Sequence, residues 1–462
     1  MDAGTADTIG KTGGKTGARP AGGWTALIEE IAEGRWISPK TGRASPPAAT
    51  RAIVIEESLD GREADLLAGL GVEGALAVVA DEATWEAMGR RVSPALAAAG
   101  RPAREVVIGG HPHADMAEAE ALAARLDGAA HVVAVGSGTI NDLCKHVTHA
   151  DGRTCSVFAT AASMDGYTSS TASMTLPSGL KVSLPAHAPL GAFFDLSVVA
   201  AAPARMAAAG FGDCLCSSVA RIDWWMSHRL HGSFFMEEPY LIAEANDREM
   251  VARAGAIGRG EVEATGYLVR SLVLSGRGVT LTRVSNHGSM GEHQISHYID
   301  CFARERHPGS LHGEQVGVAS LTMARLQGLM LASETAPTLG PTPIDEGDMA
   351  RRMGPAIAAE CAAEYRRKAL DAEGAARLSG RLAGIWPELR AECLALHVAP
   401  EAMAEALAAA GGATTPGGLG LDPAFYAEAV RHGHEMRNRY SFADLACDAG
   451  LLDGVAAGEA RA

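Results

Sequence analysis

Residues 132–142 read VVAVGSGTIND, a short apolar run that passes directly into a glycine-rich turn. The run is typical of a buried strand, and Gly136 and Gly138 let the backbone approach a phosphate closely. The helix expected next offers N–H groups and the positive end of its dipole to a pyrophosphate. The turn lacks the third glycine of the usual dinucleotide fingerprint, so a plain strand-to-helix turn is the alternative.

Around this turn, short apolar runs alternate with segments of helical periodicity. The runs occur at Ala52–Ile55, Ala75–Ala80, Glu105–Ile108, Val132–Val135 and Ser156–Ala159. Strand then helix, repeated, predicts a parallel sheet wrapped by helices. Beyond about residue 200 the apolar residues recur at helical spacing, as in Val316, Ala319 and Met323, which predicts an all-helical second half.

The patterns divide the chain into three regions. Residues 1–23 are rich in glycine, threonine, lysine and alanine and predict a disordered tail. Residues 24–200 form the expected N-terminal α/β dinucleotide-binding domain, which begins with a short amphipathic helix around Trp24 to Ile31. Residues 201–462 form the expected C-terminal helical domain, whose candidate ligands predict metal and substrate binding.

Composition narrows the class of protein. With 462 residues and 47% hydrophobic content, the chain can bury a large core. The net charge of −15, from 40 basic and 55 acidic residues, gives no electrostatic reason to bind nucleic acid or an anionic membrane. Eight scattered cysteines do not form a disulfide framework, and neither a signal peptide nor a membrane-length run is present. We therefore expect a cytoplasmic enzyme.

Two further features follow predicted strands. Asp81 stands directly after one apolar run, where a carboxylate accepts hydrogen bonds from a ribose; a helix cap is the alternative. The last run passes into a polar loop, residues 160–170, at the carboxyl end of a buried strand. Loops in that place carry ligand contacts in open α/β sheets.

The second half holds candidate metal ligands. Asp213 ends the segment Gly210–Asp213 and is expected near the start of a helix, where a helix cap is the alternative to a metal ligand. His293 and His297 lie four residues apart on one helical face, and His312 begins the next helix. One carboxylate and two imidazoles suit a catalytic divalent metal, with zinc, iron, nickel and manganese all open. Ordinary surface or core histidines are the alternative, as we expect for His287, His307, His111 and His113.

Five motifs stand in order along the chain: GSGTIND (136–142), ATAASMDGYTSS (159–170), GFGD (210–213), EHQISH (292–297) and HGEQVGV (312–318). Jointly they resemble the sn-glycerol-1-phosphate dehydrogenase family, within the superfamily of glycerol dehydrogenase, iron-containing alcohol dehydrogenase and dehydroquinate synthase. The resemblance spans roughly residues 51–329. The sequence departs from the family pattern at residues 285–290, SNHGSM, which add a histidine beside the expected site. A loop in this place can contact the far end of the substrate, so the identity of the substrate stays open.

The resemblance implies a Rossmann-like α/β domain followed by a helical domain, of the dehydroquinate synthase or iron-containing alcohol dehydrogenase type. It implies that Asp213, His293 and His312 bind one divalent metal, with zinc expected and nickel or iron as alternatives. Asp165, Asp213 and His297 would contact substrate, and Asp213 and His297 would be catalytic. NAD(H) or NADP(H) would contact Asp81, Gly136, Ser137, Gly138, Thr139, Ile140, Thr160, Ala161, Ala162, Ser163 and Ser169.

The activity that the resemblance implies is reduction of dihydroxyacetone phosphate to sn-glycerol 1-phosphate. The partner is then a small phosphorylated three-carbon substrate, with neither nucleic acid nor membrane involved, and the enzyme is expected to be a homo-oligomer. Lys145 and Lys181 are candidates for holding the phosphate because they lie near the motifs. The alternatives are a glycerol or polyol dehydrogenase, and a dehydroquinate-synthase-like cyclase that regenerates its NAD.

Overall fold

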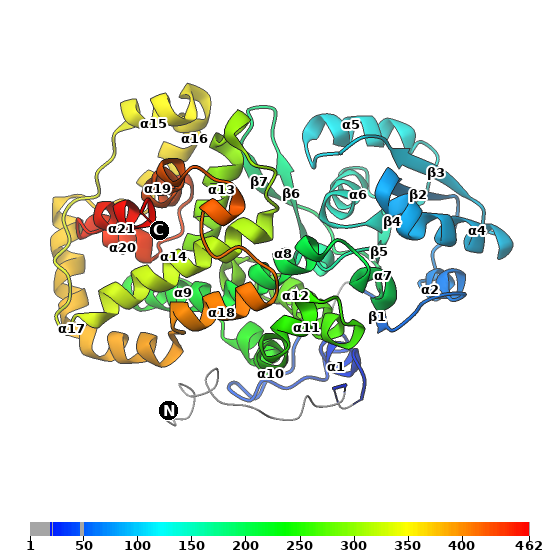
Figure 1. Ribbon diagram of the computed structural model, residues 1–462, viewed down its shortest axis with the longest axis horizontal. Coiled ribbons are helices and arrows are strands. Elements are labelled where there is room, and N and C mark those ends of the chain that lie inside the picture. Colours follow the sequence, from blue (N-terminus) through cyan, green and yellow to red (C-terminus); the bar gives the residue numbers. More distant parts are fainter. Residues whose placement is uncertain (1–18, 21, 47–49, 462) are drawn as a thin grey trace. The chain divides into compact units, whose positions relative to one another are not determined.

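The computed structural model describes residues 19–20, 22–46 and 50–461, so most of the predicted tail lies outside the described residues. The chain forms two compact units, whose elements are labelled in Figure 1. The sheet unit comprises the described residues up to Gly210 together with Glu237–Val284. The helical unit comprises Phe211–Met236 and the described residues from Ser285 onward. The domain boundary expected at residues 200 and 201 stays a prediction.

The sheet unit is built on a six-stranded sheet of order β1-β8-β5-β4-β2-β3, in which every neighbouring pair is parallel. The parallel sheet is therefore confirmed. Its strands are β1 (Ala52–Glu56), β2 (Leu76–Asp81), β3 (Ala103–Ile108), β4 (His131–Gly136), β5 (Thr154–Ala159) and β8 (Gly191–Asp195).

Three strands were not predicted from the sequence. They are β8 and the antiparallel hairpin of β6 (Thr171–Thr175) and β7 (Lys181–Pro185). In β8 the apolar run Ala192–Phe194 is only three residues long, and in β6 the two buried residues, Ala172 and Met174, alternate with polar ones. Runs this short carry little periodic signal.

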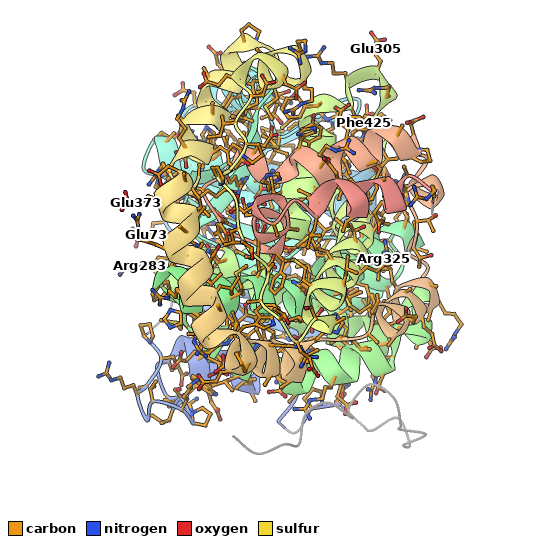
Figure 2. All side chains as sticks on the ribbon, turned by 90° about the vertical axis from the view of Figure 1, so that its left-hand side faces the viewer. Glu73, Arg283, Glu305, Arg325, Glu373 and Phe425 are labelled. Atoms are coloured by element: carbon orange, nitrogen blue, oxygen red, sulfur yellow. The ribbon has the colours of Figure 1, made fainter. Side chains whose placement is uncertain are left out.

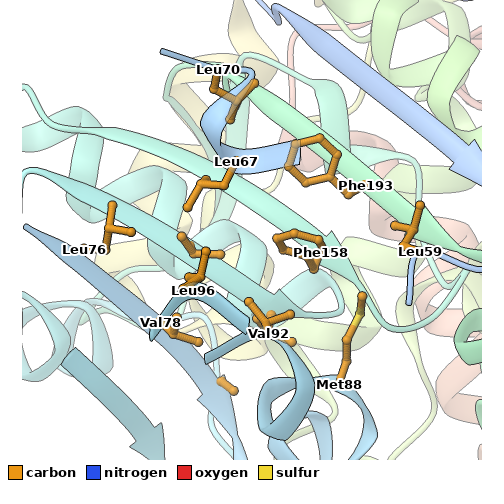
Figure 3. Close-up of a cluster of buried hydrophobic side chains, with 13 residues drawn as sticks. Leu59, Leu67, Leu70, Leu76, Val78, Met88, Val92, Leu96, Phe158 and Phe193 are labelled. Carbon is orange, nitrogen blue, oxygen red and sulfur yellow. The ribbon is translucent and has the colours of Figure 1, made fainter. Parts of the chain in front are cut away.

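Helices cover both faces of the sheet. The chain passes from β1 to β2 to β3 in one direction along the sheet and from β3 to β4 to β5 in the other. Because such crossovers are right-handed, α2 (Glu63–Ala68) and α4 (Arg90–Ala98) lie on one face, and α5 (Met116–Arg125) and α6 (Gly138–Ala150) on the other. Between the first pair of helices and the sheet lies the core of Figure 3, where Leu67, Val92 and Leu96 surround Phe158 and Phe193.

The direction of the crossovers reverses between β2 and β4, which are hydrogen-bonded neighbours. From β2 the chain leads to β3 on one side, and from β4 it leads to β5 on the other. Open α/β sheets bind ligands in the crevice outside the carboxyl ends of the strands at such a reversal. Asp81 ends β2 and Gly136 ends β4, so both predicted cofactor segments lie at this reversal.

The described residues after β8 contain helices and no strand, as the periodicity predicted. Asp422 caps one of them, accepting a hydrogen bond from the Phe425 N–H at 2.9 Å. The remaining α-helices of the two units are α1 (Ala26–Ala32), α3 (Glu82–Thr84), α7 (Leu196–Ala200), α8 (Ala204–Leu215), α9 (Ser217–His231), α10 (Glu238–Ala252), α11 (Ala254–Gly258), α12 (Val262–Thr282), α13 (Gly291–Phe302), α14 (His312–Ala332), α15 (Glu346–Met353), α16 (Pro355–Arg366), α17 (Ala372–Leu396), α18 (Pro400–Ala409), α19 (Pro423–His432), α20 (Phe442–Asp448) and α21 (Leu452–Glu459).

Acidic side chains of the helical unit project away from the ribbon, as Figure 2 shows for Glu305 and Glu373. The eight cysteines are thiols, which agrees with the absence of a disulfide framework in the sequence. Within the described part of the chain, no helix combines the length and apolar character that crossing a bilayer requires.

Candidate active site

The first candidate metal ligand stands at the opposite end of its helix from the one predicted. Asp213 lies in the last turn of α8 (Ala204–Leu215), so the expectation that it begins a helix, and with it the capping interpretation, is wrong. The helix starts after Pro203, and its glycines serve close packing instead: a Cβ on Gly212 would lie 2.4 Å from the Gly313 carbonyl oxygen. This approach brings the end of α8 against the start of α14.

The three predicted ligands come together in the helical unit. His293 lies in the first turn of α13, and His312 is the first residue of α14, as predicted. One ligand atom from each of Asp213, His293 and His312 lies within 4.8 Å of the other two. The Asp213 Oδ1 to His293 Nε2 distance is 3.7 Å, and both side chains are buried. A carboxylate and two imidazoles in this arrangement fit a catalytic divalent metal.

A second layer of hydrogen bonds fixes the two imidazoles. Nδ1 of His293 lies 2.9 Å from Glu292 Oε1, which leaves Nε2 for the side of Asp213. Nδ1 of His312 lies 3.1 Å from the Ser296 hydroxyl, which donates to Gln315 Oε1 at 2.9 Å. Such partners set ring orientation and tautomer in metal sites. Glu292 and Ser296 both belong to the EHQISH motif. Their position in that motif was the sequence signal that could have identified them as hydrogen-bond partners of the histidines.

A second group of possible ligands shares His293 and adds Cys216 and Glu292. The Cys216 thiol is engaged by main-chain oxygens, at 2.8 Å from Asp213 and 3.2 Å from Gly288. Glu292 already accepts hydrogen bonds from the Met290 N–H and from His293. These contacts engage the Cys216 thiol and Oε1 of Glu292, while the buried Oε2 of Glu292 makes no hydrogen bond to a described residue.

Burial shapes the charges behind the ligands. Glu292 is fully buried, which raises its pKa to about 7, and burial together with nearby Glu292 raises the pKa of Asp223 to about 8. Burial and the neighbouring Arg437 lower the pKa of Arg439 to about 9. The positive charge of Arg439 in turn lowers the pKa of Glu292, which opposes the effect of burial on that carboxyl.

His297 lies one turn along α13 from His293, with its ring centroid 6.2 Å from that of His293 and 5.7 Å from that of His312. Arg437 Nη2 approaches its two ring nitrogens at 3.3 and 3.5 Å. Sequence reasoning did not single out Arg437 or Arg439. They stand 140 or more residues beyond the histidine motif, and no spacing rule connects them to it.

The nucleotide-binding segment lies in the sheet unit, at the end of β4. Ser137 is extended and precedes α6, which begins at Gly138. A Cβ on Gly136 would lie 2.6 Å from the Ile140 Cβ, so glycine is required for this tight turn. Residues 137–139 remain partly accessible at the amino-terminal end of α6, where free N–H groups attract an anion.

The loop after β5 lies beside this turn. The Thr160 N–H donates to the Gly136 carbonyl at 3.1 Å, and Tyr167 Oη donates to the Ala161 carbonyl at 2.7 Å. Asp165 accepts a hydrogen bond from the Ser275 hydroxyl of α12 at 2.6 Å. Ala162 and Ser163 continue the main chain between these contacts. The loop is thus held in one conformation at the carboxyl end of the sheet.

Lys145 of α6 anchors this loop through hydrogen bonds and does not serve as a phosphate ligand. Its side chain is fully buried on α6, and Nζ donates to the Gly166 carbonyl at 2.8 Å and to the Ser169 hydroxyl at 3.0 Å. Asp142 Oδ1 lies 3.5 Å from the same ammonium. These contacts occupy the ammonium, so the earlier assignment of Lys145 as a phosphate candidate loses its basis. Ser169 is likewise engaged by the loop.

We expect Lys145→Met to lower the free energy of unfolding by about 3–5 kcal/mol, because it leaves the buried Asp142 carboxylate without its cation. The double variant Lys145→Met/Asp142→Asn should recover part of this loss. Lys40→Met, which breaks an exposed ion pair with Glu237, is the control and should cost about 1 kcal/mol or less. Urea unfolding of all four proteins measures the difference. A double variant less stable than Lys145→Met would contradict the pairing.

Asp81 is a helix cap. Its Oδ1 accepts from the Thr84 N–H at 2.8 Å, and its own N–H donates to Thr84 Oγ1 at 3.0 Å. The capping interpretation is therefore confirmed. A carboxylate has further acceptor sites, and Asp81 is only partly buried.

Comparison with known proteins agrees with this architecture. Residues 54–203 match the family model described as iron-containing alcohol dehydrogenase. Solved structures of the same fold include a probable glycerol dehydrogenase from Sinorhizobium meliloti 1021, at 19% identity and a TM-score of 0.59, covering 88% of this chain and 98% of that one. Another is the NADH-dependent butanol dehydrogenase A of Thermotoga maritima, at 14% identity and a TM-score of 0.59, covering 88% and 97%.

Sequence relatives are more specific. The glycerol-1-phosphate dehydrogenase (NAD(P)+) of Bacillus velezensis is 28% identical over 370 residues, which are 79% of this chain and 83% of that protein. The enzyme of the same name from Thermococcus kodakarensis is 30% identical over 281 residues, 60% of this chain and 78% of that protein. Together with the convergence of Asp213, His293 and His312, these matches show that the chain belongs to the glycerol-1-phosphate dehydrogenase family.

Proposed function

We propose that the chain catalyses the NAD(P)H-linked, metal-dependent reduction of dihydroxyacetone phosphate to sn-glycerol 1-phosphate. The observation that carries the proposal is the convergence of Asp213, His293 and His312 on one point, with His297 a turn away on the same helix. Two relatives that match most of their own length to this chain are named as glycerol-1-phosphate dehydrogenases. We propose zinc as the metal, with nickel or iron as alternatives.

A reduced nicotinamide bound along Gly136–Ile140 would supply the hydride for the substrate carbonyl carbon, and the carbonyl oxygen would need a proton from the protein. A divalent metal held by Asp213, His293 and His312 supplies Lewis acidity for the carbonyl when bound. Glu292 and Ser296 hold the two imidazoles in the orientation that this ligand set needs. His297 binds the substrate hydroxyl or moves the proton, and Asp165 positions the substrate from its own loop.

We propose that the cofactor's pyrophosphate binds at the amino-terminal end of α6, along Gly136–Ile140, with Thr160–Ser163 and Ser169 beside it. The reversal of strand order between β2 and β4 supports this assignment. The proposed location is the cytoplasm, in keeping with eight cysteine thiols. The homo-oligomeric state expected from the resemblance stays a prediction.

Substrate specificity tests the proposal. Oxidation of reduced nicotinamide, followed by its absorbance with metal-reconstituted enzyme, should be much faster with dihydroxyacetone phosphate than with dihydroxyacetone, and the reverse reaction should not accept glycerol well. A polyol dehydrogenase of the same superfamily would show the opposite preference. A rate with dihydroxyacetone equal to that with the phosphate ester would contradict the proposal that dihydroxyacetone phosphate is the substrate.

Cofactor choice should depend on Asp81. If its carboxylate lies near the ribose, it repels a 2′-phosphate, and NADH is used at least as well as NADPH. Asp81→Asn keeps a cap acceptor for the Thr84 N–H but removes the charge. We expect it to shift the ratio of kcat/KM values toward NADPH by at least about fivefold, since two charges 4 Å apart interact by about 1 kcal/mol even in water.

The control for this shift is Asp115→Asn, which alters the cap of α5 in the same way, because Asp115 accepts from the Glu118 N–H at 2.8 Å. The kcat/KM values for both cofactors are measured in wild type and both variants. An unchanged ratio in Asp81→Asn would place Asp81 outside the cofactor site and leave it as a cap alone.

A further inference from the structure

One short extended segment of the helical unit carries two arginines, Arg437 and Arg439, and Arg437 lies beside His297. Arg437 follows the 3-10 turn Gly433–Met436 with φ −144° and ψ 159°, which is an extended conformation. Residues two apart in an extended chain point to the same side, so Arg437 and Arg439 face one way and the exposed Asn438 faces the other. Both arginine residues are partly buried.

The backbone of this segment is fixed against α13, the helix that carries His293 and His297. A Cβ on Gly433 would lie 2.9 Å from the Gln294 carbonyl oxygen, so only glycine permits this contact. Gln294 Nε2 and Lys368 Nζ donate to the Arg439 carbonyl at 3.1 and 2.8 Å. Lys368 is in turn paired with the buried Asp444 at 2.6 Å. These contacts hold the backbone of both arginines in a fixed position, as a precise binding site requires.

Arg437 lacks the partner that a half-buried cation normally has. Among the described residues it forms no ion pair, and its side-chain hydrogen-bond contacts are the two long approaches to the His297 ring at 3.3 and 3.5 Å. One nitrogen nearly equidistant from both ring nitrogens does not point at a single lone pair, so this is a weak hydrogen bond. The nearby Glu435 is bound to Arg352 at 2.8 Å and to His432 at 2.7 Å.

Arg439 adds a second positive charge. Its guanidinium donates to the Ser289 carbonyl and, at 2.9 Å, to the Ser285 hydroxyl, so it also holds the loop that leads into α13. Burial lowers the pKa of both arginines, and the positive charge of Arg437 lowers the pKa of Arg439 further. Two close cations of this kind, without a carboxylate on Arg437, are stabilised by an anion that binds between them.

We infer that Arg437, with Arg439 behind it, binds the phosphate group of the substrate. The inference rests on the proposed function, since it names the group that recognises the phosphate end of the same substrate. Arg437 contacts the His297 ring, whose centroid lies 6.2 Å from that of His293 and 5.7 Å from that of His312, so these separations suit a short substrate that spans from the proposed metal ligands to the guanidinium. A planar guanidinium suits a phosphate because it donates two parallel hydrogen bonds.

The test compares Arg437→Gln, Arg437→Lys and wild type on dihydroxyacetone phosphate and dihydroxyacetone. Arg437→Gln should lower the preference for the phosphate ester, the ratio of the two kcat/KM values, by about 10²-fold, which is the usual loss for a hydrogen-bonded charged partner. Arg437→Lys keeps the charge and should lose less. Arg431→Gln, which removes an equal charge from an exposed pair with Asp453, should leave the ratio unchanged.

The source of the phosphate is tested by running each variant with NADH and with NADPH. A loss confined to NADPH would assign Arg437 to the cofactor's phosphate and overturn the inference. Wild-type protein supplies a measurement that does not depend on folding of a variant: an arginine-specific reagent followed by peptide mapping. Orthophosphate should protect Arg437 from modification, and equal modification with and without orthophosphate would overturn the inference.

Failure of the inference and failure of the proposed function give different results. A preference for the phosphate ester that survives Arg437→Gln, in protein with normal metal content and thermal stability, overturns the assignment of Arg437 alone. A wild-type enzyme without any such preference overturns the proposed function, and this inference with it.

Discussion

The His293→Ala variant should purify with substoichiometric metal, whereas His297→Ala should keep near wild-type metal and lose about 10²–10⁴-fold in kcat/KM, the usual range for a positioned acid–base group. The two histidines share one face of α13, so their spacing alone does not separate their roles. The structure gives a physical reason for the difference. His293 Nε2 lies 3.7 Å from Asp213, and its Nδ1 is held by Glu292.

His297, by contrast, is not in the group of ligand atoms that lie within 4.8 Å of one another, and Arg437 approaches its ring. Its loss should therefore impair substrate positioning or proton transfer while the metal stays bound. Elemental analysis and steady-state kinetics on both variants make the comparison. If His297→Ala loses the metal and His293→Ala keeps it, the two assignments must be exchanged.

Removal of the divalent metal is expected to lower turnover at least about 10³-fold, because several kcal/mol of transition-state stabilisation is lost with it. Adding the metal back should restore the rate. Thermal unfolding of the stripped protein serves as the control, since an inactive but folded protein separates chemistry from stability. Chelated protein that elemental analysis shows to be metal-free and that still turns over at the original rate would rule out this mechanism.

The proposed ligand set came from the family resemblance, while local patterns predicted where its histidines lie on their helices. Two histidines four residues apart must share a helical face, and His312 opens the next helix, as the structure confirms. The place of Asp213 was predicted wrongly for a physical reason. Glycines 210 and 212 suggested the start of a helix, but Gly212 is there to let α8 approach Gly313, a contact between segments 101 residues apart that no local pattern reveals.

The same limit applies to the sheet and to the arginines. Strands with long apolar runs, such as β2 and β4, were predicted, whereas β8 joins the sheet through pairing with β1 and β5, which only the tertiary fold specifies. Arg437 reaches His297 because Gly433 packs on α13. Burial and the lack of a carboxylate partner distinguish Arg437, and both are properties of the fold. In a sequence with 40 basic residues, no local pattern distinguishes this arginine from the others.

The most direct test of the central claim is the stoichiometry of the reaction with dihydroxyacetone phosphate. Metal-reconstituted enzyme, given reduced nicotinamide and this substrate, is followed by absorbance while the product is identified by chiral analysis. The account predicts one reduced cofactor consumed for each sn-glycerol 1-phosphate formed. Conversion of a substrate without net loss of reduced cofactor, as a cyclase would show, or formation of the opposite enantiomer, would contradict it.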